Sequence, residues 1–264
     1  MLASLKQLLR YRALVGSLVA RELKARYRGS VLGFLWTFVN PLLLLLVYTF
    51  VFSVVMPGAR APGLEPYSLF LFCGILPWTW FSSSLLESCT ALTGSGSLLR
   101  KVMFPAEILP LVTVLTGLVN FCLGLVILAA FTVYSGLPFF TADLVWLPVI
   151  VLVQLAWTLG LALLLSALSV HFRDIRDLLG NLMTLWFFAT PIVYPYTQAP
   201  ERFRPLLDLN PFTHIAGAYQ DVLFVGGRYS PGSRLALVGV VAVLVLAVGY
   251  GVFDRLRDTF AEEV

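Results

Sequence analysis

Apolar residues occur along this chain in long runs, which short polar or turn-rich segments separate. In residues 1–30 leucine and valine recur at helical spacing with cations between them, and Gly29-Ser30 ends that pattern. The pattern is typical of an amphipathic helix lying in a membrane interface, with a solvated basic tail as the alternative. The apolar run Val31–Met56 follows at once, and about twenty apolar residues suffice to cross a bilayer.

The remaining runs predict an all-α integral membrane protein, with six transmembrane helices in a single domain that covers residues 1–264. Pro41 and Pro77 fall inside the first and second helices, where each removes a backbone hydrogen bond and is expected to kink the helix. The fifth range is the shortest. The six ranges are about 33–56, 67–92, 107–134, 144–169, 178–193 and 234–253.

Two of the linking segments are more apolar than ordinary loops. Residues 97–105 are both basic and apolar, as in a short amphipathic helix that docks into a partner's groove; an interfacial helix on lipid is the alternative. Residues 194–233 contain short apolar segments broken by prolines. They predict re-entrant or interfacial helices between the fifth and sixth spans that would close an exit, with an ordinary amphipathic outer loop as the alternative.

The distribution of cations orients the chain. Residues 1–30 hold seven of the eighteen Lys and Arg residues, and cytoplasmic segments of membrane proteins are rich in these residues. With the amino terminus in the cytoplasm, six spans place the carboxyl terminus there too. The segments then predicted to be cytoplasmic hold thirteen Lys and Arg residues and the outer segments hold five. This difference supports the orientation, although residues 194–233 are basic for an outer segment.

Composition excludes a soluble enzyme. The chain is 59% hydrophobic and 12% charged, whereas a soluble domain carries about 25% charged residues. Because the cations lie mostly at the edges of the predicted spans, we expect membrane lipids with anionic headgroups as partners and no nucleic acid. The three cysteines have neither a paired nor a zinc-binding spacing, so no metal site is expected.

The sequence contains no P-loop, no HExxH and no GxSxG motif, so we expect no catalytic residue and no cofactor bound by this chain. A membrane enzyme acting on lipid-linked sugars would need a dense polar cluster, and residues 171–177 are the best candidate. Their charge spacing is more typical of a salt-bridged turn. Glu87, inside the second span, either lines a path or couples movements, or it is an acid that reaches the interface.

Aromatic residues make up 14% of the chain. Tryptophans at both interfaces and in helix packing explain many of them. The other interpretation is a surface on which sugar rings stack along a transport path. The candidates for this channel lining are Trp78, Trp80, Phe81, Trp186, Phe187 and Phe188.

Several short motifs occur in one order along almost the whole chain, on the six-span pattern. Together they resemble the permease subunit of the ABC exporters for polysaccharides and polyol phosphates, which export O-antigen, teichoic acid and capsule. The motifs are residues 25–36 (ARYRGSVLGFLW), 40–43 (NPLL), 74–78 (GILPW), 99–105 (LRKVMFP), 172–175 (FRDI), 190–194 (TPIVY) and 209–213 (LNPFT).

This resemblance implies a homodimer in the bacterial cytoplasmic (inner) membrane, bound to two copies of an ATPase subunit that holds ATP and Mg. It implies a glycan on an undecaprenyl carrier as the substrate. It also implies a coupling helix that docks on the ATPase and gate helices on the outer side. The coupling residues would be Leu99, Arg100, Lys101, Val102, Met103, Phe104 and Pro105, and the gate residues Tyr194, Tyr196, Phe203, Pro211 and Phe212.

On this hypothesis the cations at the inner mouth attract the pyrophosphate of the carrier through charge-assisted hydrogen bonds. The alternatives are an ABC permease for a drug or a small lipid and, less favoured, the membrane enzyme considered above. The inner-mouth candidates are Arg21, Lys24, Arg26 and Arg28.

Overall fold

Helices make up the computed structural model, which describes residues 11–26, 28–55, 64–95, 105–139, 141–172, 174–225 and 233–260; these ranges contain no strand. Short 3-10 or π-helical turns flank several of the α-helices. The α-helices are α2 (Arg12–Arg26), α3 (Trp36–Phe50), α4 (Tyr67–Ala91), α6 (Ile108–Tyr134), α7 (Leu147–His171), α8 (Ile175–Phe188), α9 (Arg204–Leu209), α10 (Pro211–Gln220) and α11 (Ser233–Leu256).

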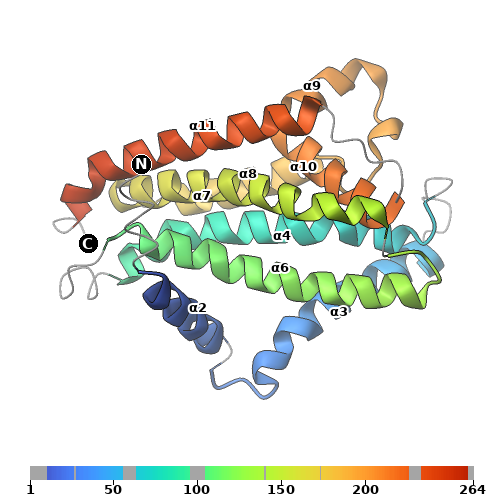
Figure 1. Cartoon of the computed structure of the whole chain (residues 1–264), viewed down its shortest axis with the longest axis horizontal. Coiled ribbons are helices and arrows are strands. Elements are labelled where there is room, and N and C mark those ends of the chain that lie inside the picture. The colour runs from blue at the N-terminus through green and yellow to red at the C-terminus, as the bar shows by residue number, and fades with distance from the viewer. Residues whose placement is uncertain are drawn as a thin grey trace.

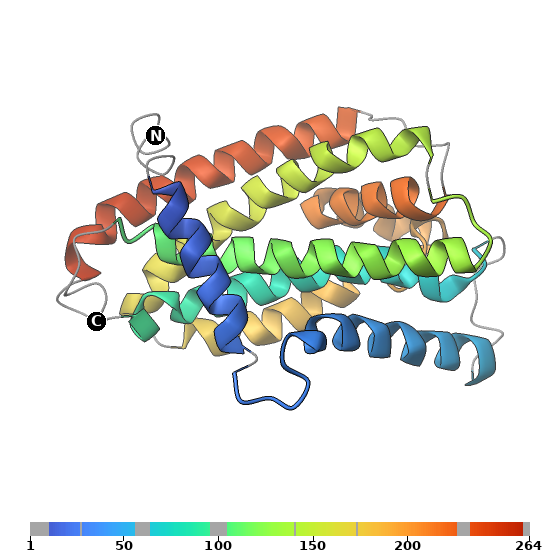
Figure 2. The ribbon, with the colours of Figure 1, turned by 60° about the horizontal axis from the view of Figure 1, so that its bottom comes forward.

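The long helices run along one axis and form a bundle (Figure 1). Helix α4 packs against α6 and α7, and α7 packs against α11. The chain reverses direction between successive long helices, so α2, the start of α6 and the C-terminal ends of α7 and α11 gather at one end (Figures 1 and 2). Helices α9 and α10 lie toward the other end. We call these the α2 end and the α10 end.

Helix α4 is the most deeply buried of the four long apolar helices, and polar side chains join it to its neighbours in both directions. The buried Gln154 side chain donates to the carbonyl oxygen of Pro77 at 2.8 Å. The Trp80 indole donates to the carbonyl oxygen of Val114 at 3.1 Å. The Tyr67 hydroxyl donates to the carbonyl oxygen of Val193 at 2.7 Å. Because unpaired polar groups are costly away from water, these bonds fix α4 against α6, α7 and the segment after α8.

Two glycines allow α7 and α11 to approach closely. A Cβ atom on Gly160 would lie 2.6 Å from the backbone nitrogen of Leu246, and one on Gly249 would overlap the carbonyl oxygen of Gly160. Small residues at such crossings let helix backbones pack directly, which is a main source of helix association in membranes. The α7–α11 contact therefore depends on the absence of side chains at both positions.

Four of the six predicted spans are confirmed as helices long and apolar enough to cross a membrane: Tyr67–Ala91, Ile108–Tyr134, Ala142–His171 and Arg234–Thr259. The first predicted span corresponds to the shorter helix α3, which a 3-10 turn (Gly33–Leu35) precedes and a π-helical turn (Val51–Val55) follows. Pro41 and Pro77 both lie inside helices that continue past them.

The fifth predicted span, about 178–193, has different bounds in the structure. Helix α8 begins at Ile175 and ends at Phe188. Its early end has a local cause, because Pro191 cannot donate a helical hydrogen bond and disfavours a helical backbone at Thr190 before it. The chain then turns through residues 189–195 instead of completing the predicted helix.

Helix α2 covers part of the predicted amino-terminal helix and ends at Arg26, while residues 1–10 of that prediction lie outside the described residues. The position of this helix in a membrane interface stays a prediction. Gly29 has a φ of +80°, a conformation that favours glycine, so the predicted break at Gly29-Ser30 is confirmed. Val15 of α2 is buried against Ile108 and Val112 at the start of α6. The apolar face of α2 is therefore partly covered by the bundle itself.

Substitution of Gly160 by alanine is expected to loosen the α7–α11 contact, because its Cβ meets the backbone of Leu246. Overpacking of this kind costs about 1–3 kcal/mol. The thermal midpoint of the detergent-purified protein, followed by fluorescence-detected size exclusion, should fall clearly. Gly251→Ala is the matched control on α11, since a Cβ there meets nothing within 4 Å. An equal fall in the thermal midpoint for both variants would contradict a close α7–α11 contact at Gly160.

Candidate functional site

An ion pair joins α2 to α4 at the α2 end of the bundle. The Arg26 guanidinium nitrogen Nη2 lies 2.7 Å from both Glu87 carboxylate oxygens. The Arg26 side chain is 31% exposed and that of Glu87 42%. Arg26 is the last residue of α2, and Glu87 faces it from the last two turns of α4. Glu87, whose role the sequence left open, therefore lies beside one of the predicted inner-mouth cations.

A small cavity of about 180 Å³ begins at Arg26 and extends between α3, α4 and α6. Its lining includes the polar side chains of Thr37, Asn40 and Asn120. The Thr37 hydroxyl and the Asn120 amide oxygen are buried and have no hydrogen-bond partner. Since unpartnered buried polar atoms are costly, these two atoms mark places where a polar ligand group or a water would bind.

The other predicted inner-mouth cations lie on the surface near Arg26. Arg21 and Lys24 of α2 and Arg28 just after it are exposed. They surround the end of α2 with positive charge but do not line the cavity. Their predicted contact with a pyrophosphate group stays a prediction.

The predicted coupling segment lies largely outside the described residues, because the structure describes the chain only up to Ser95 and again from Pro105. Both flanks, the C-terminal end of α4 and the start of α6, lie at the α2 end (Figure 1). Glu107, at the start of α6, is buried. The coupling role of residues 99–105 stays a prediction.

The predicted channel aromatics form a packed cluster between α4, α8 and α10. Trp78 and Phe81 are buried and meet Phe212, with ring centroids 5.0 and 4.8 Å away. Trp186 of α8 approaches Phe81 edge-on at 5.4 Å. Phe187 lies 5.6 Å from Trp78. These rings therefore contact one another in this conformation, in the offset and edge-to-face arrangements that aromatic pairs prefer.

Of the other two predicted channel aromatics, Trp80 stands apart from this cluster and Phe188 joins it only at its edge, through a contact with Phe187 at 5.3 Å. Trp80 points the other way on α4, stacks on Phe121 at 5.2 Å and lines the small cavity. Phe188, the last residue of α8, is 63% exposed. The structure thus separates the six candidates into packed rings, a cavity-lining ring and an exposed ring, and their predicted contact with sugars stays a prediction.

Asn210 connects the segment after α8 to α10. Its side-chain oxygen accepts from the Trp186 indole at 2.9 Å and from the backbone N–H of Phe212 at 3.0 Å. Its side-chain nitrogen donates to the Thr190 hydroxyl at 2.9 Å. The residue thereby caps α10, as asparagine does at many helix N-termini, and holds the end of α8 against it.

Asp208 fixes the short helix α9 to its surroundings. Its carboxylate accepts from the Tyr196 hydroxyl at 2.9 Å and pairs with Arg234 of α11 at 3.5 Å. Its carbonyl oxygen lies 2.9 Å from His214 Nε2. Burial and the neighbouring Asp208 carboxylate raise the pKa of Tyr196. The predicted gate segment is therefore an ordered part of the bundle, tied to both α10 and α11.

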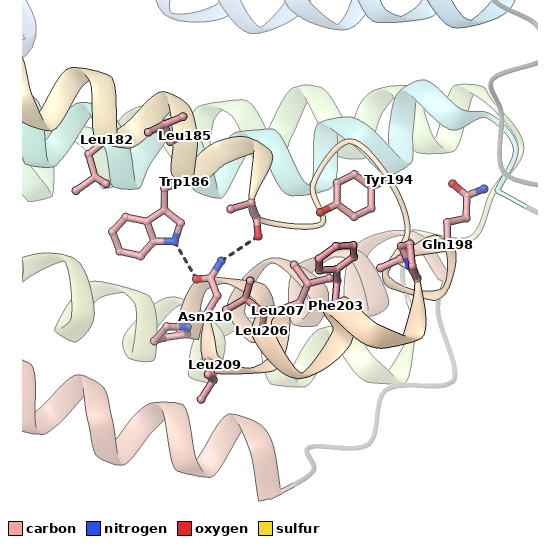
Figure 3. Close-up of a pocket in the computed structure, with 14 residues that line it drawn as sticks. Leu182, Leu185, Trp186, Tyr194, Gln198, Phe203, Leu206, Leu207, Leu209 and Asn210 are labelled. Carbon is pink, nitrogen blue, oxygen red and sulfur yellow. Dashed lines mark hydrogen bonds between the residues drawn. The ribbon is translucent and has the colours of Figure 1, made fainter.

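A large apolar pocket of about 830 Å³ opens between α8 and the predicted gate segment (Figure 3). Trp186 and Leu185 lie on one side of it, and Phe203 and Leu206 on the other. Of the predicted gate residues, Tyr194 and Pro211 also line the pocket, whereas Phe212 is fully buried behind it. The prediction of short helices between the fifth and sixth spans is confirmed by α9 and α10, while their role as a gate stays a prediction.

Sequence inspection missed Asn210 and Asp208 as organising residues, although the motif at 209–213 contained Asn210. An Asn-Pro pair before an apolar stretch is a helix-start signal that identifies this cap. It also missed Thr37 and Asn120, since isolated polar residues in apolar runs give no indication of which neighbour they face.

The fold and the site define a class of protein: an α-helical membrane protein with several spans, a polar cavity at one end and apolar short helices at the other. A family description for ABC-2 type transporters matches residues 13–224. The chain belongs to the ABC-2 type transporter family. The family expected from the sequence motifs is therefore confirmed, and the chain is a multi-pass membrane protein.

Several named proteins resemble the chain over most of its length. The O-antigen export system permease protein RfbA of Myxococcus xanthus is 43% identical, with all of both chains covered. RfbA of Klebsiella pneumoniae is 34% identical over 92% of this chain and 91% of its own. The polysialic acid transport protein KpsM of Escherichia coli is 23% identical over 92% of this chain and 93% of its own. The names of these relatives agree with a transporter and not with an enzyme.

Asn210→Ala is expected to free the predicted gate segment from α8, because it removes the acceptor for Trp186 and the cap of α10. Loss of a cap alone costs about 1 kcal/mol. Hydrogen–deuterium exchange should become faster in residues 189–215 and stay unchanged in α7. Asn210→Asp keeps the acceptor and loses the bonds that the side-chain nitrogen donates to Thr190 and to the carbonyl oxygen of Ala189, so its exchange should lie between that of the wild type and that of Asn210→Ala. Identical exchange in all three proteins would refute the capping role.

Asp221→Asn is expected to stabilise the protein near neutral pH. Partial desolvation, and then repulsion from Asp143, raise the pKa of Asp221 to about 6, although part of the residue remains exposed; the unfolded value is about 3.9. Its contribution to the free energy of unfolding is therefore complete below about pH 4 and is lost as the pH rises through about 6. Thermal midpoints of the variant and the wild type should agree at about pH 4 and diverge at about pH 8. Glu201→Gln, at an exposed acid, should have little effect.

Proposed function

We propose that this chain is the channel-forming transmembrane subunit of an ATP-driven exporter in the bacterial inner membrane. The substrate is a polysaccharide of the O-antigen, capsule or teichoic acid type, linked to undecaprenyl and moved from the cytoplasm to the outer face. The observation that carries the proposal is the full-length match to an O-antigen export permease at 43% identity. The similarity to a polysialic acid transport protein supports the wider substrate class.

The proposed topology has six spans with both termini in the cytoplasm, so that the α2 end faces inward. The cationic end of α2 and the excess of Lys and Arg in these segments support this orientation. Helix α3 with its flanking turns covers residues 33–55 without a break, which is long enough to span. Helix α8 has 14 residues and is about 21 Å long, shorter than a hydrocarbon core of about 30 Å. The short helices beside α10 would complete its passage.

Energy must come from another subunit, because the sequence has no motif for nucleotide binding. Two copies of an ATPase subunit, which hold ATP and Mg, would dock at the α2 end. The described residues on either side, Ser95 and Pro105, lie at this end of the bundle (Figure 1), and the sequence of the segment 99–105 is both basic and apolar. It would transmit ATPase closure to α4 and α6, which it joins.

The proposed transport path lies between two copies of the chain related by a two-fold axis. Helix α8 supports this arrangement, since Asn181 and Thr184 are exposed on it beside Leu182 and Leu185. Polar side chains within membrane helices face protein or a water-filled path rather than lipid. The exposed ring of Phe188 on the same helix would meet sugar rings there.

Deletion of the gene should remove the glycan from the cell surface and leave lipid-linked glycan in the cytoplasmic leaflet. Complementation with the wild type should restore export, whereas Phe104→Asp should insert and assemble but fail to export, because a buried charge disrupts an apolar docking contact. ATPase activity of the complex in nanodiscs should no longer respond to substrate in that variant. Phe104→Leu is the matched control and should export normally.

Normal surface glycan in the deletion strain would overturn the proposed substrate. A changed resistance to drugs or a changed lipid distribution in that strain would instead favour the alternative permease. Normal export by Phe104→Asp would remove the coupling role from this segment without affecting the substrate assignment.

A further inference from the structure

The Arg26–Glu87 pair places two opposite charges inside the rim of an apolar bundle. Glu87 lies in the last two turns of α4 with 42% of its side chain exposed, and a carboxylate in an apolar helix is costly unless it is paired or reaches water. Arg26 provides the pairing, with Nη2 2.7 Å from both oxygens. An attachment of α2 to the bundle does not require this pair, because Val15 already packs against Ile108 and Val112. The position of the carboxylate therefore calls for another explanation.

The position of Arg26 provides that explanation, because the same side chain lines the cavity between α3, α4 and α6. Thr37, 3% exposed, also lines this cavity, and its hydroxyl has no partner. The Asn120 amide oxygen beside it is unpartnered as well. A cation that lies between a partly exposed carboxylate and a cavity with unpartnered polar atoms in its lining can exchange one anionic partner for another.

We propose that Glu87 is an internal competitor for the phosphate headgroup of a lipid, which binds in this cavity on Arg26. In the protein without bound lipid, the Glu87 carboxylate accepts the hydrogen bonds of the Arg26 guanidinium. When the headgroup enters, its phosphate oxygens take over the hydrogen bonds of Arg26, and Glu87 turns away. Thr37 donates its hydroxyl to the bound group, and Asn120 accepts from a hydroxyl on it. This inference rests on the proposed function, since it assigns a contact at the inner mouth of the same transport path.

The chemistry of the cavity selects a phosphate headgroup. Arginine binds carboxylates and phosphates with the same donors, so the two are interchangeable partners. The volume of about 180 Å³ is below the range of about 300–1,000 Å³ in which drug-sized ligands are held. It suits a phosphate with the first part of its attached group, while longer glycan must extend out of the cavity.

A competitor has a function in transport, since a substrate must bind well enough to enter and weakly enough to leave. The negative charge of Glu87 lowers the affinity for the headgroup, both by holding Arg26 and by repelling the phosphate. It also keeps Arg26 paired when no lipid is bound, which avoids a lone charge in this part of the bundle.

The test compares the affinities of variants for undecaprenyl diphosphate, measured by native mass spectrometry of the chain with its ATPase partner in nanodiscs. Glu87→Gln should bind about three- to tenfold more tightly than the wild type, as expected for release of a partly exposed ion pair. Arg26→Gln should bind more weakly. The double variant should bind far more weakly than Glu87→Gln and close to Arg26→Gln, because without Arg26 only the repulsion between Glu87 and the phosphate is left to relieve.

Two controls separate competition from attachment and from general charge. Glu87→Asp keeps the carboxylate and should bind close to the wild type. Glu22→Gln removes an equal charge from the exposed surface of α2 and should change the affinity far less than Glu87→Gln. If the pair served only to attach α2, Glu87→Gln and Arg26→Gln would both weaken binding. Weaker or unchanged binding by Glu87→Gln would therefore overturn the proposal.

A second probe identifies the source of the phosphate. Nanodiscs with phosphatidylglycerol are compared with nanodiscs of phosphatidylcholine alone, and retained lipid is counted on each variant. If Glu87→Gln raises the affinity for undecaprenyl diphosphate alone, the cavity binds the carrier lipid. If it raises the affinity for phosphatidylglycerol equally, the cavity binds membrane phospholipid. Failure of the proposed function is separate, since it would appear as normal surface glycan in the deletion strain whatever the affinities.

Discussion

The burial of α4 among the surrounding helices is the constraint on which the rest of the structure depends. In a bilayer every polar backbone group must find a partner within the protein, and helices meet that requirement individually. The polar side chains between the helices need partners as well, and these partners must come from neighbouring helices. Gln154, Trp80 and Tyr67 do so by bonding to backbone oxygens across α4 and its neighbours. These bonds and the glycine contact between α7 and α11 hold the long helices together, and α2, α8 and α9 lie at the margins of the bundle.

The two ends of this bundle differ in their chemistry. The Arg26–Glu87 pair and the exposed cations of α2 lie at the α2 end, while the ring cluster and the apolar pocket lie toward the α10 end, beside the surface ion pair of Asp208 and Arg234. A substrate with an anionic lipid headgroup and a sugar chain has the complementary division of chemistry. The proposed export function uses both ends: recognition of the phosphate where positive charge is available, and passage of sugars beside aromatic side chains, which contact them without strict selectivity.

The short helices α9 and α10 show how a connecting segment becomes part of a fold. Asn210 caps α10 and holds Trp186 and Thr190, and Asp208 joins Tyr196 to Arg234. Each residue connects elements that are far apart in the sequence. An ordinary outer loop would not need such bonds, whereas a segment whose position is coupled to α8 and α11 would move with them during transport.

The sequence by itself determined the class of fold, the extent of the four long spans and the family, because apolar length and cation placement depend on the solvent and not on tertiary contacts. It also identified the break at Gly29-Ser30 and the short helices after the fifth span. Only the tertiary structure decided what the polar residues within the spans do. That Glu87 meets Arg26, 61 positions away, and that Thr37 and Asn120 share a cavity, depends on which helix faces pack together. The apolar pattern does not encode those pairings, since every face of a buried or lipid-covered helix is apolar.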